Sequence, residues 1–265
     1  MSHVVTPDTS SSGATPNPAP RTEKQIVLSV RGASKRYGAV QALGGADLDL
    51  HAGEVVALVG DNGAGKSTLV KVISGAVSSD SGSITFEGRE VRIGRPQDAQ
   101  ALGITTVFQD LALCENLDVV ANLFLGTESR HYGVLGEIRM ERRARDLLTS
   151  LDVRISDVRS PVAALSGGQR QSVAIARALL GDPKVVILDE PTAALGVEQT
   201  AQVLGLIGRL RERGLAVLLI SHNLADVRQV SDRIAVLRLG RNAGTFDTAS
   251  VSQQTVVAAI TGAGA

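Results

Sequence analysis

The sequence predicts an α/β fold, with a parallel sheet at its core, an antiparallel β subdomain and an inserted helical subdomain. Two continuous apolar runs, residues 54–60 (EVVALVG) and 184–190 (KVVILDE), have the composition of strands that are buried on both faces. Segments with a helical spacing of apolar residues separate such runs, and this alternation is typical of parallel βαβ units. Around the first run, apolar residues alternate with small or polar ones, as they do in half-buried antiparallel strands.

The antiparallel subdomain is predicted from three segments near the start of the chain. Residues 26–31 (IVLSVR) and 43–50 (LGGADLDL) show this alternation. Residues 82–91 predict two further short strands around a turn at Glu87-Gly88. Three or four antiparallel strands are therefore expected to surround the first buried run.

The remaining elements complete the parallel core and its insertion. A helix is predicted directly after the first run and ends at Gly75. The middle of the chain, roughly 96–180, is predicted to be mostly helical, because apolar residues recur there every three or four positions. The sequence shows no internal repeat, so one such unit is expected. The elements expected after the insertion are a strand at 184–190, a helix from about Val197 to Arg213 closed by Gly214, and strands at 216–222 and 233–240.

Composition sets limits on the class of protein. At 265 residues with 43% hydrophobic side chains, the chain can bury one large core. Lys and Arg together number 27, as do Asp and Glu, and this balance argues against nucleic acid as a partner, because binding a phosphate backbone needs excess positive charge. Cys114 is the only cysteine, so no intrachain disulfide can form and a reducing compartment is expected.

Residues 1–24 are predicted to be a disordered tail, because they are rich in Ser, Thr, Pro, Ala and Gly and offer little to bury. They lack the basic and apolar regions of a secretory signal. No apolar run approaches the ~20 residues needed to span a bilayer, so another chain would have to hold this protein at a membrane. A single folded domain is expected over residues 25–262.

A phosphate-binding loop is predicted at residues 60–67, which fit the pattern GxxxxGK[ST] between a buried strand and a helix. Glycines let successive backbone N–H groups turn toward a phosphate, and the helix N-terminus adds partial positive charge. Lys66 can reach the β- and γ-phosphates, and the Ser67 hydroxyl can ligate Mg²⁺. The predicted phosphate-binding residues are Gly60, Asp61, Asn62, Gly63, Ala64, Gly65, Lys66, Ser67 and Thr68.

The second apolar run supplies a matching acidic strand end. Four apolar residues bury this strand, and Asp189 follows where it can hold the Mg²⁺ or its waters. The adjacent Glu190 is placed to orient the attacking water or to take a proton from it. Acidic residues are common at the ends of buried strands. When such a strand follows a phosphate-binding loop in the sequence, however, it indicates a nucleotide-binding core.

A third motif is Leu165-Ser166-Gly167-Gly168-Gln169. Ser166 and Gln169 form an S-x-x-Q capping box at the start of a predicted helix. Two glycines inside a helix start are costly, up to ~1 kcal/mol each. We expect them to let backbone amides approach an anion at the helix N-terminus.

These three motifs, in this order, resemble the ATPase subunit of ABC transporters, and the resemblance covers about residues 26–245. It implies a P-loop NTPase fold with a RecA-like core. It also implies a head-to-tail homodimer, with ATP sandwiched between the phosphate loop of one cassette and Ser166, Gly167, Gly168 and Gln169 of the other.

Further positions match the family one at a time. Tyr37 resembles the aromatic residue that stacks on adenine, and Gln109 resembles the glutamine that touches Mg²⁺ and senses the membrane subunits. His222 resembles the switch histidine that contacts the γ-phosphate. The resemblance thus implies Lys66, Gln109, Glu190 and His222 as catalytic residues, and Ser67, Gln109 and Asp189 as metal ligands.

One position departs from the family. After Glu190-Pro191-Thr192 the family usually has a short loop that ends in Leu-Asp, but here Gly196 follows Leu195. That aspartate normally helps to join the two ATP sites across the dimer. Its replacement puts the coupling between the sites in doubt, though not nucleotide binding.

Within the family, three stretches resemble sugar-importer ATPases of the ribose and xylose type. They are GDNGAGKSTLVKVISG, VFQDLALCENLDVVANLFLG and PTAALGVEQT. Many members of that subclass fuse two cassettes, whereas this chain has one. The subclass implies a transmembrane permease and an extracytoplasmic sugar-binding protein as partners, and a peripheral location on the cytoplasmic face of the inner membrane.

Two alternatives stay open. The chain could energise another class of ABC transporter, such as an amino-acid importer or an exporter. A soluble ABC protein acting on ribosomes or DNA is disfavoured, because such chains usually carry paired cassettes with a charged linker, or a long coiled-coil insertion. A simple P-loop kinase or GTPase would lack the Leu165–Gln169 motif.

Overall fold

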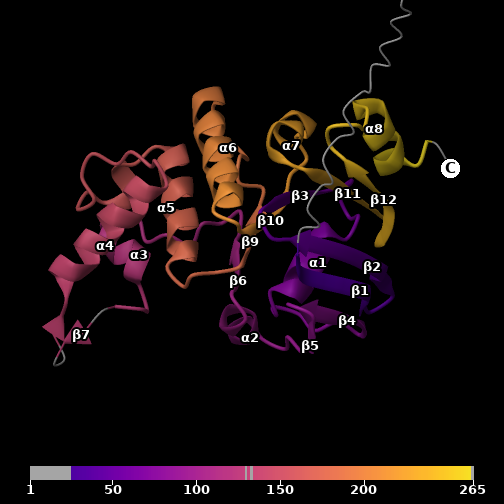
Figure 1. The fold of residues 1–265 in the computed structure, drawn as a ribbon, viewed down its shortest axis with the longest axis horizontal. Helices are drawn as coiled ribbons and strands as arrows, with labels where there is room; N and C mark the ends of the chain where they lie inside the picture. The colour runs from indigo at the N-terminus through magenta and orange to yellow at the C-terminus, as the bar shows by residue number, and fades with distance from the viewer. Residues whose placement is uncertain (1–24, 129, 132–133, 264–265) are drawn as a thin grey trace, which may run out of the picture.

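The computed structural model describes residues 25–128, 130–131 and 134–263. The disordered tail predicted for residues 1–24 lies outside them. Figure 1 shows an elongated arrangement, with an antiparallel sheet at one end, a parallel sheet in the middle and a group of helices at the other end. No helix among the described residues combines the length and apolar character that crossing a membrane would need.

The central sheet of the described residues has the strand order β12-β11-β3-β10-β9-β6. β3, β6, β9, β10 and β11 run parallel, and β12 pairs antiparallel with β11 at one edge. Strand β3 is buried at every position, which explains its unbroken apolar sequence. The strands are β3 (Glu54–Val59), β6 (Ile104–Val107), β9 (Val185–Asp189), β10 (Ala216–Ile220), β11 (Arg233–Arg238) and β12 (Arg241–Asp247).

The second sheet is antiparallel, as the alternating segments predict, with the order β2-β1-β4-β5. Its first two strands are longer than the expected 26–31 and 43–50. Gly38, at a φ of +56°, forms a tight turn that lets Tyr37 pair with Val40, so the hairpin continues to its end. The strands are β1 (Ile26–Tyr37), β2 (Val40–His51), β4 (Ser81–Phe86) and β5 (Arg89–Val91).

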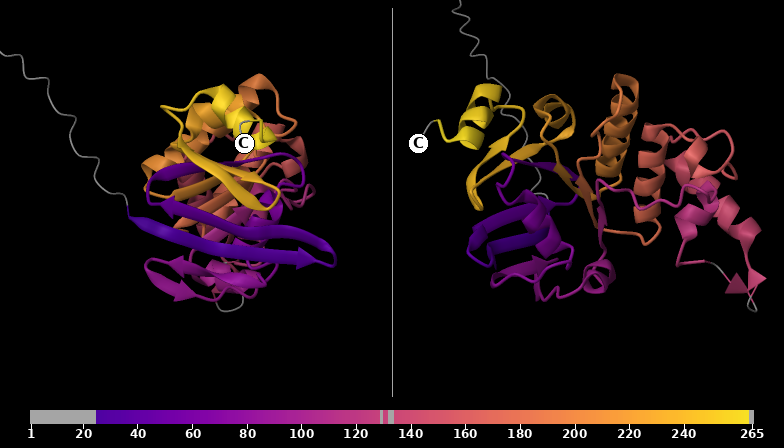
Figure 2. Two further views of the ribbon diagram at one scale, coloured as in Figure 1. Left: turned by 90° about the vertical axis from the view of Figure 1, so that its right-hand side faces the viewer. Right: turned by 180° about the vertical axis from the view of Figure 1, so that it is seen from behind.

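Helices cover both faces of the central sheet and form the far end of the molecule. Figures 1 and 2 place α3, α4, α5 and the hairpin β7–β8 together at the end opposite the antiparallel sheet. The helices are α1 (Lys66–Ile73), α2 (Pro96–Ala101), α3 (Val119–Phe124), α4 (Glu137–Ser150), α5 (Gly167–Leu179), α6 (Val197–Glu212), α7 (Leu224–Val230) and α8 (Gln253–Thr261). A 3₁₀ turn spans Val162–Ala164, and the hairpin joins Arg130–His131 to Val134–Leu135.

The segment 96–180, expected to be mostly helical, also contributes to the central sheet. Its residues Ile104–Val107 form β6, which pairs parallel with β9. A four-residue strand between two helical stretches carries too few side chains to show a period of two, so the sequence pattern did not reveal it.

Among the described residues, three groups of buried apolar side chains hold these layers together. Val56 and Leu58 of β3 belong to the group shared with α1 and the antiparallel sheet. Val55 belongs to the group shared with α5, α6 and the helical end. Ala57 and Val59 contact a third group beneath α7 and α8. Strand β3 therefore lies at the junction of all three groups, which stiffens the backbone that leads into the loop after it.

Candidate active site

The loop after β3 has a conformation that requires glycine at two positions. Gly60 has a φ of +155°, and a Cβ there would lie 2.3 Å from the carbonyl oxygen of Leu237. Gly65 has a φ of +103°, and a Cβ there would lie 2.6 Å from the carbonyl oxygen of Ala42. Both contacts are with backbone, so they cannot relax by a side-chain movement. The loop is thus wedged between β2 and β11, and only glycine fits.

The turn between β11 and β12 fastens the same loop. The amide of Gly240, between β11 and β12, donates to the carbonyl of Ala64 at 2.9 Å. The carbonyl of Gly240 accepts from the amide of Gly44 in β2 at 2.8 Å. Two sheets therefore hold the loop through their backbones, which gives it a defined shape.

Lys66 begins α1 and reaches back over the loop. Its ammonium group donates to the carbonyl of Gly60 at 2.8 Å and to that of Asp61 at 3.1 Å. No side chain caps the start of α1, where Gly65 is the N-cap residue. The first N–H groups of α1 and the positive charge of Lys66 thus lie together at this loop. Such an arrangement is suited to binding a polyphosphate.

The acidic strand end lies at the carboxyl edge of the central sheet. Asp189 is the last residue of β9, and Glu190 follows with a φ of +52° and an amide that donates to the carbonyl of Ile220 at 3.0 Å. Burial raises the pKa of the Asp189 carboxyl, and the neighbouring charge of Glu190 adds to the rise, while Lys66 and Lys71 oppose it. Two carboxylates and two cations therefore share this part of the sheet edge.

His222 contacts Glu190 directly. The Nδ1 atom of His222 lies 2.8 Å from Oε2 of Glu190. β9 and β10 are parallel neighbours with Ile220 opposite Asp189, so the residues that follow the two strands meet. The His222 side chain is 74% exposed and that of Glu190 only 17%, so a half-buried carboxylate is joined to an imidazole that faces solvent. In such a pair the carboxylate can accept a proton, and its contact with the imidazole fixes the orientation of the ring.

Gln109 and Tyr37 lie at the edges of this site. Gln109 comes two residues after β6, whose Val107 pairs with Leu188, so it leaves the sheet beside the end of β9. Its side chain is exposed. Tyr37 ends β1 and is 45% exposed, with the ammonium of Lys35 5.8 Å from its ring centroid. The hairpin that carries Tyr37 continues to Ala42, which contacts the loop at Gly65.

The predicted capping box at the start of α5 is confirmed. The hydroxyl of Ser166 accepts from the amide of Gln169 at 3.2 Å, and the amide of Ser166 donates to the Gln169 side chain at 3.0 Å. The same Gln169 side chain donates to the carbonyl of Arg154 at 3.0 Å. The start of this helix is therefore held by its own side chains.

The two glycines of this motif have a role that sequence reasoning missed. A Cβ at Gly167 would lie 2.9 Å from Cδ2 of Leu195, and one at Gly168 would lie 3.0 Å from Cβ of Gln199. The start of α5 thus packs closely on the loop and the first turn of α6. Glycine lets the two helices approach this closely without displacing Leu195 or Gln199, whether or not an anion also approaches the amides.

The structure brings some of the predicted residues together and leaves others apart. The loop 60–67, Asp189, Glu190 and His222 all follow strands of one sheet at the same edge. The helix α5, which begins after Ser166, belongs to the other end of the molecule from α1 (Figures 1 and 2). Within a single chain, the loop 60–67 and the segment Ser166–Gln169 therefore lie apart.

Another contact that the sequence did not predict joins the loops that carry Glu190 and His222. The hydroxyl of Thr192, two residues after Glu190, donates to Oδ2 of Asp226 at 2.7 Å. Asp226 is buried in α7, the helix that follows His222. The family motif includes Thr192, but nothing in the sequence marks Asp226 as its partner.

The three side chains predicted to ligate Mg²⁺ all offer oxygen donors, namely the hydroxyl of Ser67, the amide of Gln109 and the carboxylate of Asp189. Among the described residues there is no group of three or more His, Cys, Asp or Glu side chains that could hold a metal. The donors present are of the kind that Mg²⁺ takes beside substrate phosphates, where the protein supplies one or two ligands and the nucleotide supplies others.

The fold and the loop at 60–67 define a P-loop NTPase, and comparisons with known proteins define its family. The ABC transporter family matches residues 43–193. A fructose import ATP-binding protein of Rhizobium meliloti is 47% identical over 248 residues, which cover 91% of this chain and 95% of that protein. A xylose/arabinose import ATP-binding protein of Sulfolobus acidocaldarius is 47% identical over 215 residues, which cover 81% of this chain and 86% of that protein.

Solved structures agree with this assignment. An ATP-binding cassette of an ABC transporter in its ADP conformation superposes with a TM-score of 0.76 at 26% identity, covering 89% of this chain and 95% of that one. A nucleotide-free cassette gives a TM-score of 0.75 at 27% identity, covering 84% and 91%. The chain belongs to the ATP-binding subunits of ABC transporters, and it is an ATPase.

Proposed function

We propose that this chain drives the import of a monosaccharide, as one of two identical cassettes bound to a transmembrane permease. The observation that carries the catalytic part of this proposal is the 2.8 Å contact between Glu190 and His222 beside Asp189. The substrate class is supported by the names of similar proteins, which import fructose, xylose or arabinose, and by their coverage of nearly the whole chain.

In this proposal each residue of the half-site has a distinct role. Lys66 and the amides of residues 60–68 bind the phosphates, and Tyr37 stacks on the adenine. Glu190 takes a proton from the attacking water, and His222, held by Glu190, contacts the γ-phosphate. Ser67, Gln109 and Asp189 would hold Mg²⁺. The bound ion would neutralise part of the negative charge of the phosphates.

The proposal includes a head-to-tail dimer of two cassettes, which the separation of Ser166–Gln169 from the phosphate loop supports. Ser166, Gly167, Gly168 and Gln169 begin a helix in a part of the chain separate from Lys66, so they complete the ATP site of a partner cassette. The permease holds the pair at the cytoplasmic face of the inner membrane, and an extracytoplasmic sugar-binding protein delivers the sugar to that permease.

The variant Glu190→Gln tests the catalytic assignment. It should keep ATP binding but lower the turnover number to a few per cent or less, because the amide cannot accept the proton of the water, a loss on the order of 10²-fold. Since hydrolysis separates the dimer, the variant should accumulate with ATP as a dimer in light scattering. Glu212→Gln, an exposed acid at the far end of α6, is the matched control and should behave as the unmodified protein. Normal steady-state ATPase activity of Glu190→Gln with the permease would refute the role of Glu190.

The phosphate contact has its own test. Lys66→Ala should weaken ATP binding itself, because it removes the positive charge that pairs with the phosphates. Equilibrium binding of ATP to the isolated chain measures this loss. Unchanged affinity would mean that Lys66 does not bind the nucleotide.

The transport assignment is tested in cells. Deletion of the gene should abolish uptake of one labelled monosaccharide from a panel of fructose, xylose, arabinose and ribose, and the unmodified gene should restore it while Glu190→Gln does not. Undiminished uptake of every sugar, together with loss of amino-acid uptake or of export, would assign the chain to another class of ABC transporter.

A further inference from the structure

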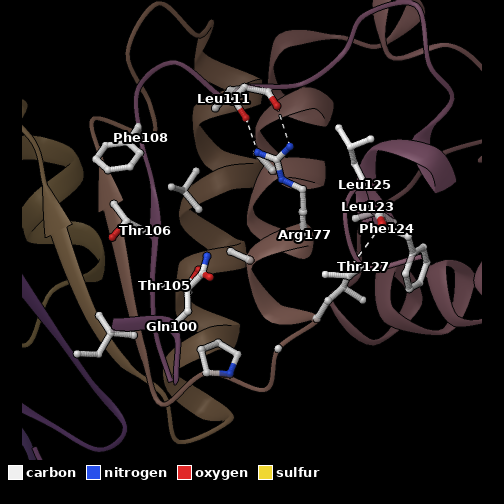
Figure 3. Close-up of a pocket in the computed structure, with 18 of the residues that line it drawn as sticks. Gln100, Thr105, Thr106, Phe108, Leu111, Leu123, Phe124, Leu125, Thr127 and Arg177 are labelled. Atoms are coloured by element: carbon white, nitrogen blue, oxygen red, sulfur yellow. Dashed lines mark hydrogen bonds between the residues drawn. The ribbon is translucent and has the colours of Figure 1, made fainter. Parts of the chain in front are cut away.

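Arg177, in the last turn of α5, binds a loop that belongs to a different part of the site. Its Nη1 donates to the carbonyl of Ala112 and its Nη2 to the carbonyl of Leu111, both at 2.7 Å. Figure 3 shows the guanidinium of Arg177 hydrogen-bonded to backbone at Leu111, among the residues that line a cavity. The volume of this cavity is about 510 Å³. No ion pair between Arg177 and a carboxylate occurs in the part of the chain that the structure describes. A partly buried cation is therefore used to hold a piece of backbone.

The loop that Arg177 holds is the one that begins with Gln109. Ala112 has a φ of +47°, a left-handed conformation that is uncommon for alanine, and its amide donates to Oδ1 of Asp110 at 3.1 Å. Arg177 and Asp110 thus fix the two sides of the Ala112 peptide. Strain of this kind persists only where surrounding contacts impose it.

The contacts before and after Gln109 tie the chain to different parts of the structure. Before it, Val107 of β6 pairs with Leu188 in the central sheet. After it, the fully buried Asn122 of α3 accepts from the amide of Cys114 at 2.7 Å and donates to its carbonyl at 2.9 Å. Arg177 adds the tie to α5. Gln109 therefore lies where the chain passes from the sheet to the helical end.

We propose that Arg177 is a positioning residue for Gln109, because it fixes the loop that carries that side chain against the last turn of α5. This proposal rests on the proposed function, which assigns Gln109 to the Mg²⁺. The two carbonyls that Arg177 binds belong to the second and third residues after Gln109, and both hydrogen bonds are 2.7 Å long. With Asp110 holding the amide of Ala112, the backbone that leads away from Gln109 has a defined course.

The first test compares Arg177→Met, which keeps the apolar stem but removes all donors, with Arg177→Lys. The readouts are the turnover number and the Mg²⁺ concentration for half-maximal ATPase activity, measured on the full chain with its permease in lipid. We expect Arg177→Met to lower turnover roughly tenfold and to raise the Mg²⁺ requirement, because a misplaced Gln109 binds the ion poorly. ATP binding without Mg²⁺ should not change. Arg177→Lys should be intermediate, since one ammonium cannot hold both carbonyls in a fork.

Arg143→Met is the matched control. Arg143 lines the same cavity and donates to the carbonyl of Leu180 at 3.0 Å, but it does not bind the loop that begins with Gln109. It should leave the Mg²⁺ requirement unchanged. The same rise in Arg143→Met would show that loss of any arginine at this cavity produces the effect, and would overturn the proposal.

A double-mutant cycle with Gln109→Ala separates positioning from a structural role. If Arg177 acts through Gln109, adding Arg177→Met to Gln109→Ala should change turnover less than twofold. Effects that multiply in the double variant would overturn the proposal. A normal Mg²⁺ requirement in Gln109→Ala alone would instead reject the proposed function of Gln109.

Hydrogen exchange tests the hold on the loop without relying on the role of Gln109. In Arg177→Met, amides in residues 109–115 should exchange at least tenfold faster than in the unmodified chain, because the two hydrogen bonds to the loop are lost. Amides in residues 60–75 should keep their protection, and Arg143→Met should leave both segments unchanged. Unchanged exchange of residues 109–115 in Arg177→Met would overturn the proposal.

Discussion

The phosphate loop and the Ser166–Gln169 segment both place glycines at the start of a helix, but the glycines serve different purposes. In the phosphate loop, Gly60 and Gly65 adopt positive φ and exclude any side chain by contacts with backbone. In the second segment, Gly167 and Gly168 do not have positive φ, and a side chain there would meet Leu195 or Gln199. The first pair shapes a loop, whereas the second pair permits two helices to approach.

The two helix starts also differ in how their N–H groups are satisfied. α1 has no side-chain cap, so its first amides are available to a phosphate. α5 is capped by Ser166 and Gln169, so its start is stable by itself. From this difference we expect the phosphate loop to depend on backbone shape and the second segment on its fit to a partner. Substitutions in and around the two segments test this contrast.

The largest effect is expected for Gly65→Ala. A Cβ 2.6 Å from the Ala42 carbonyl, at a φ of +103°, forces backbone to move. We expect a loss of about 2–4 kcal/mol in the free energy of unfolding and at least a tenfold loss of ATP affinity. Denaturant unfolding and calorimetric titration of ATP measure the two. Gly63→Ala is the control, with a φ of +80° and open space around the Cβ, so it should cost only ~1–2 kcal/mol. Equal losses in the two variants would contradict the backbone argument.

A smaller effect is expected for Gly168→Ala, and on a different property. ATP binding by the isolated chain should be unchanged, because the phosphate loop is untouched. ATP-dependent dimerisation in the Glu190→Gln background should weaken about tenfold, or ~1.4 kcal/mol, because the added methyl group displaces the start of α5 from α6. Sedimentation with ATP measures the dimer. Gln199→Gly should restore much of it in the double variant, since it removes the opposing Cβ. Dimerisation of Gly168→Ala as strong as that of the parent would show that the close packing is not needed for the dimer.

A third prediction concerns the carboxyl group of Asp189. Its pKa is raised in the folded chain, chiefly by burial and next by the charge of Glu190, so the ionised form costs stability at neutral pH. The folded state binds more protons than the unfolded state between the two pKa values, so this cost grows as the pH rises from about 4. Asp189→Asn should therefore raise the Tm without nucleotide by a few degrees at most near pH 7.5, and the gain should vanish near pH 4. A thermal scan across pH measures it, with Asp182→Asn, an exposed acid, as the control.

The smallest effect is expected at Gly196, where the family usually has aspartate. Gly196 is the N-cap of α6 with a φ of −72°, and a Cβ added there would have nothing within 4 Å, so the backbone accepts a side chain. Because glycine cannot join the two ATP sites, we predict a Hill coefficient for ATP nearer 1 than 2 in the unmodified protein. Gly196→Asp should raise it with turnover preserved, and Gly196→Asn, which caps the helix without a charge, is the control. Strong cooperativity of the unmodified protein with its permease in lipid would show that the coupling uses other residues.

Much of the site could be predicted because its parts are local. The phosphate loop, the acidic end of β9 and the Ser166–Gln169 cap each consist of residues adjacent in sequence, whose chemistry follows from their own backbone. The parallel core was predicted for the same reason, since a strand buried on both faces must be apolar along its length.

Only the tertiary structure decided which of these parts touch. The contact of Glu190 with His222 depends on β9 and β10 being neighbours in the sheet, and the fork from Arg177 to Leu111 and Ala112 joins segments 65 and 66 residues apart. β6 was missed because four residues are too few to show a period. A sequence pattern indicates whether a residue will be buried or exposed and which local structure it favours. Which distant residue becomes its neighbour depends on strand order and helix packing, and these follow from the packing of the whole chain.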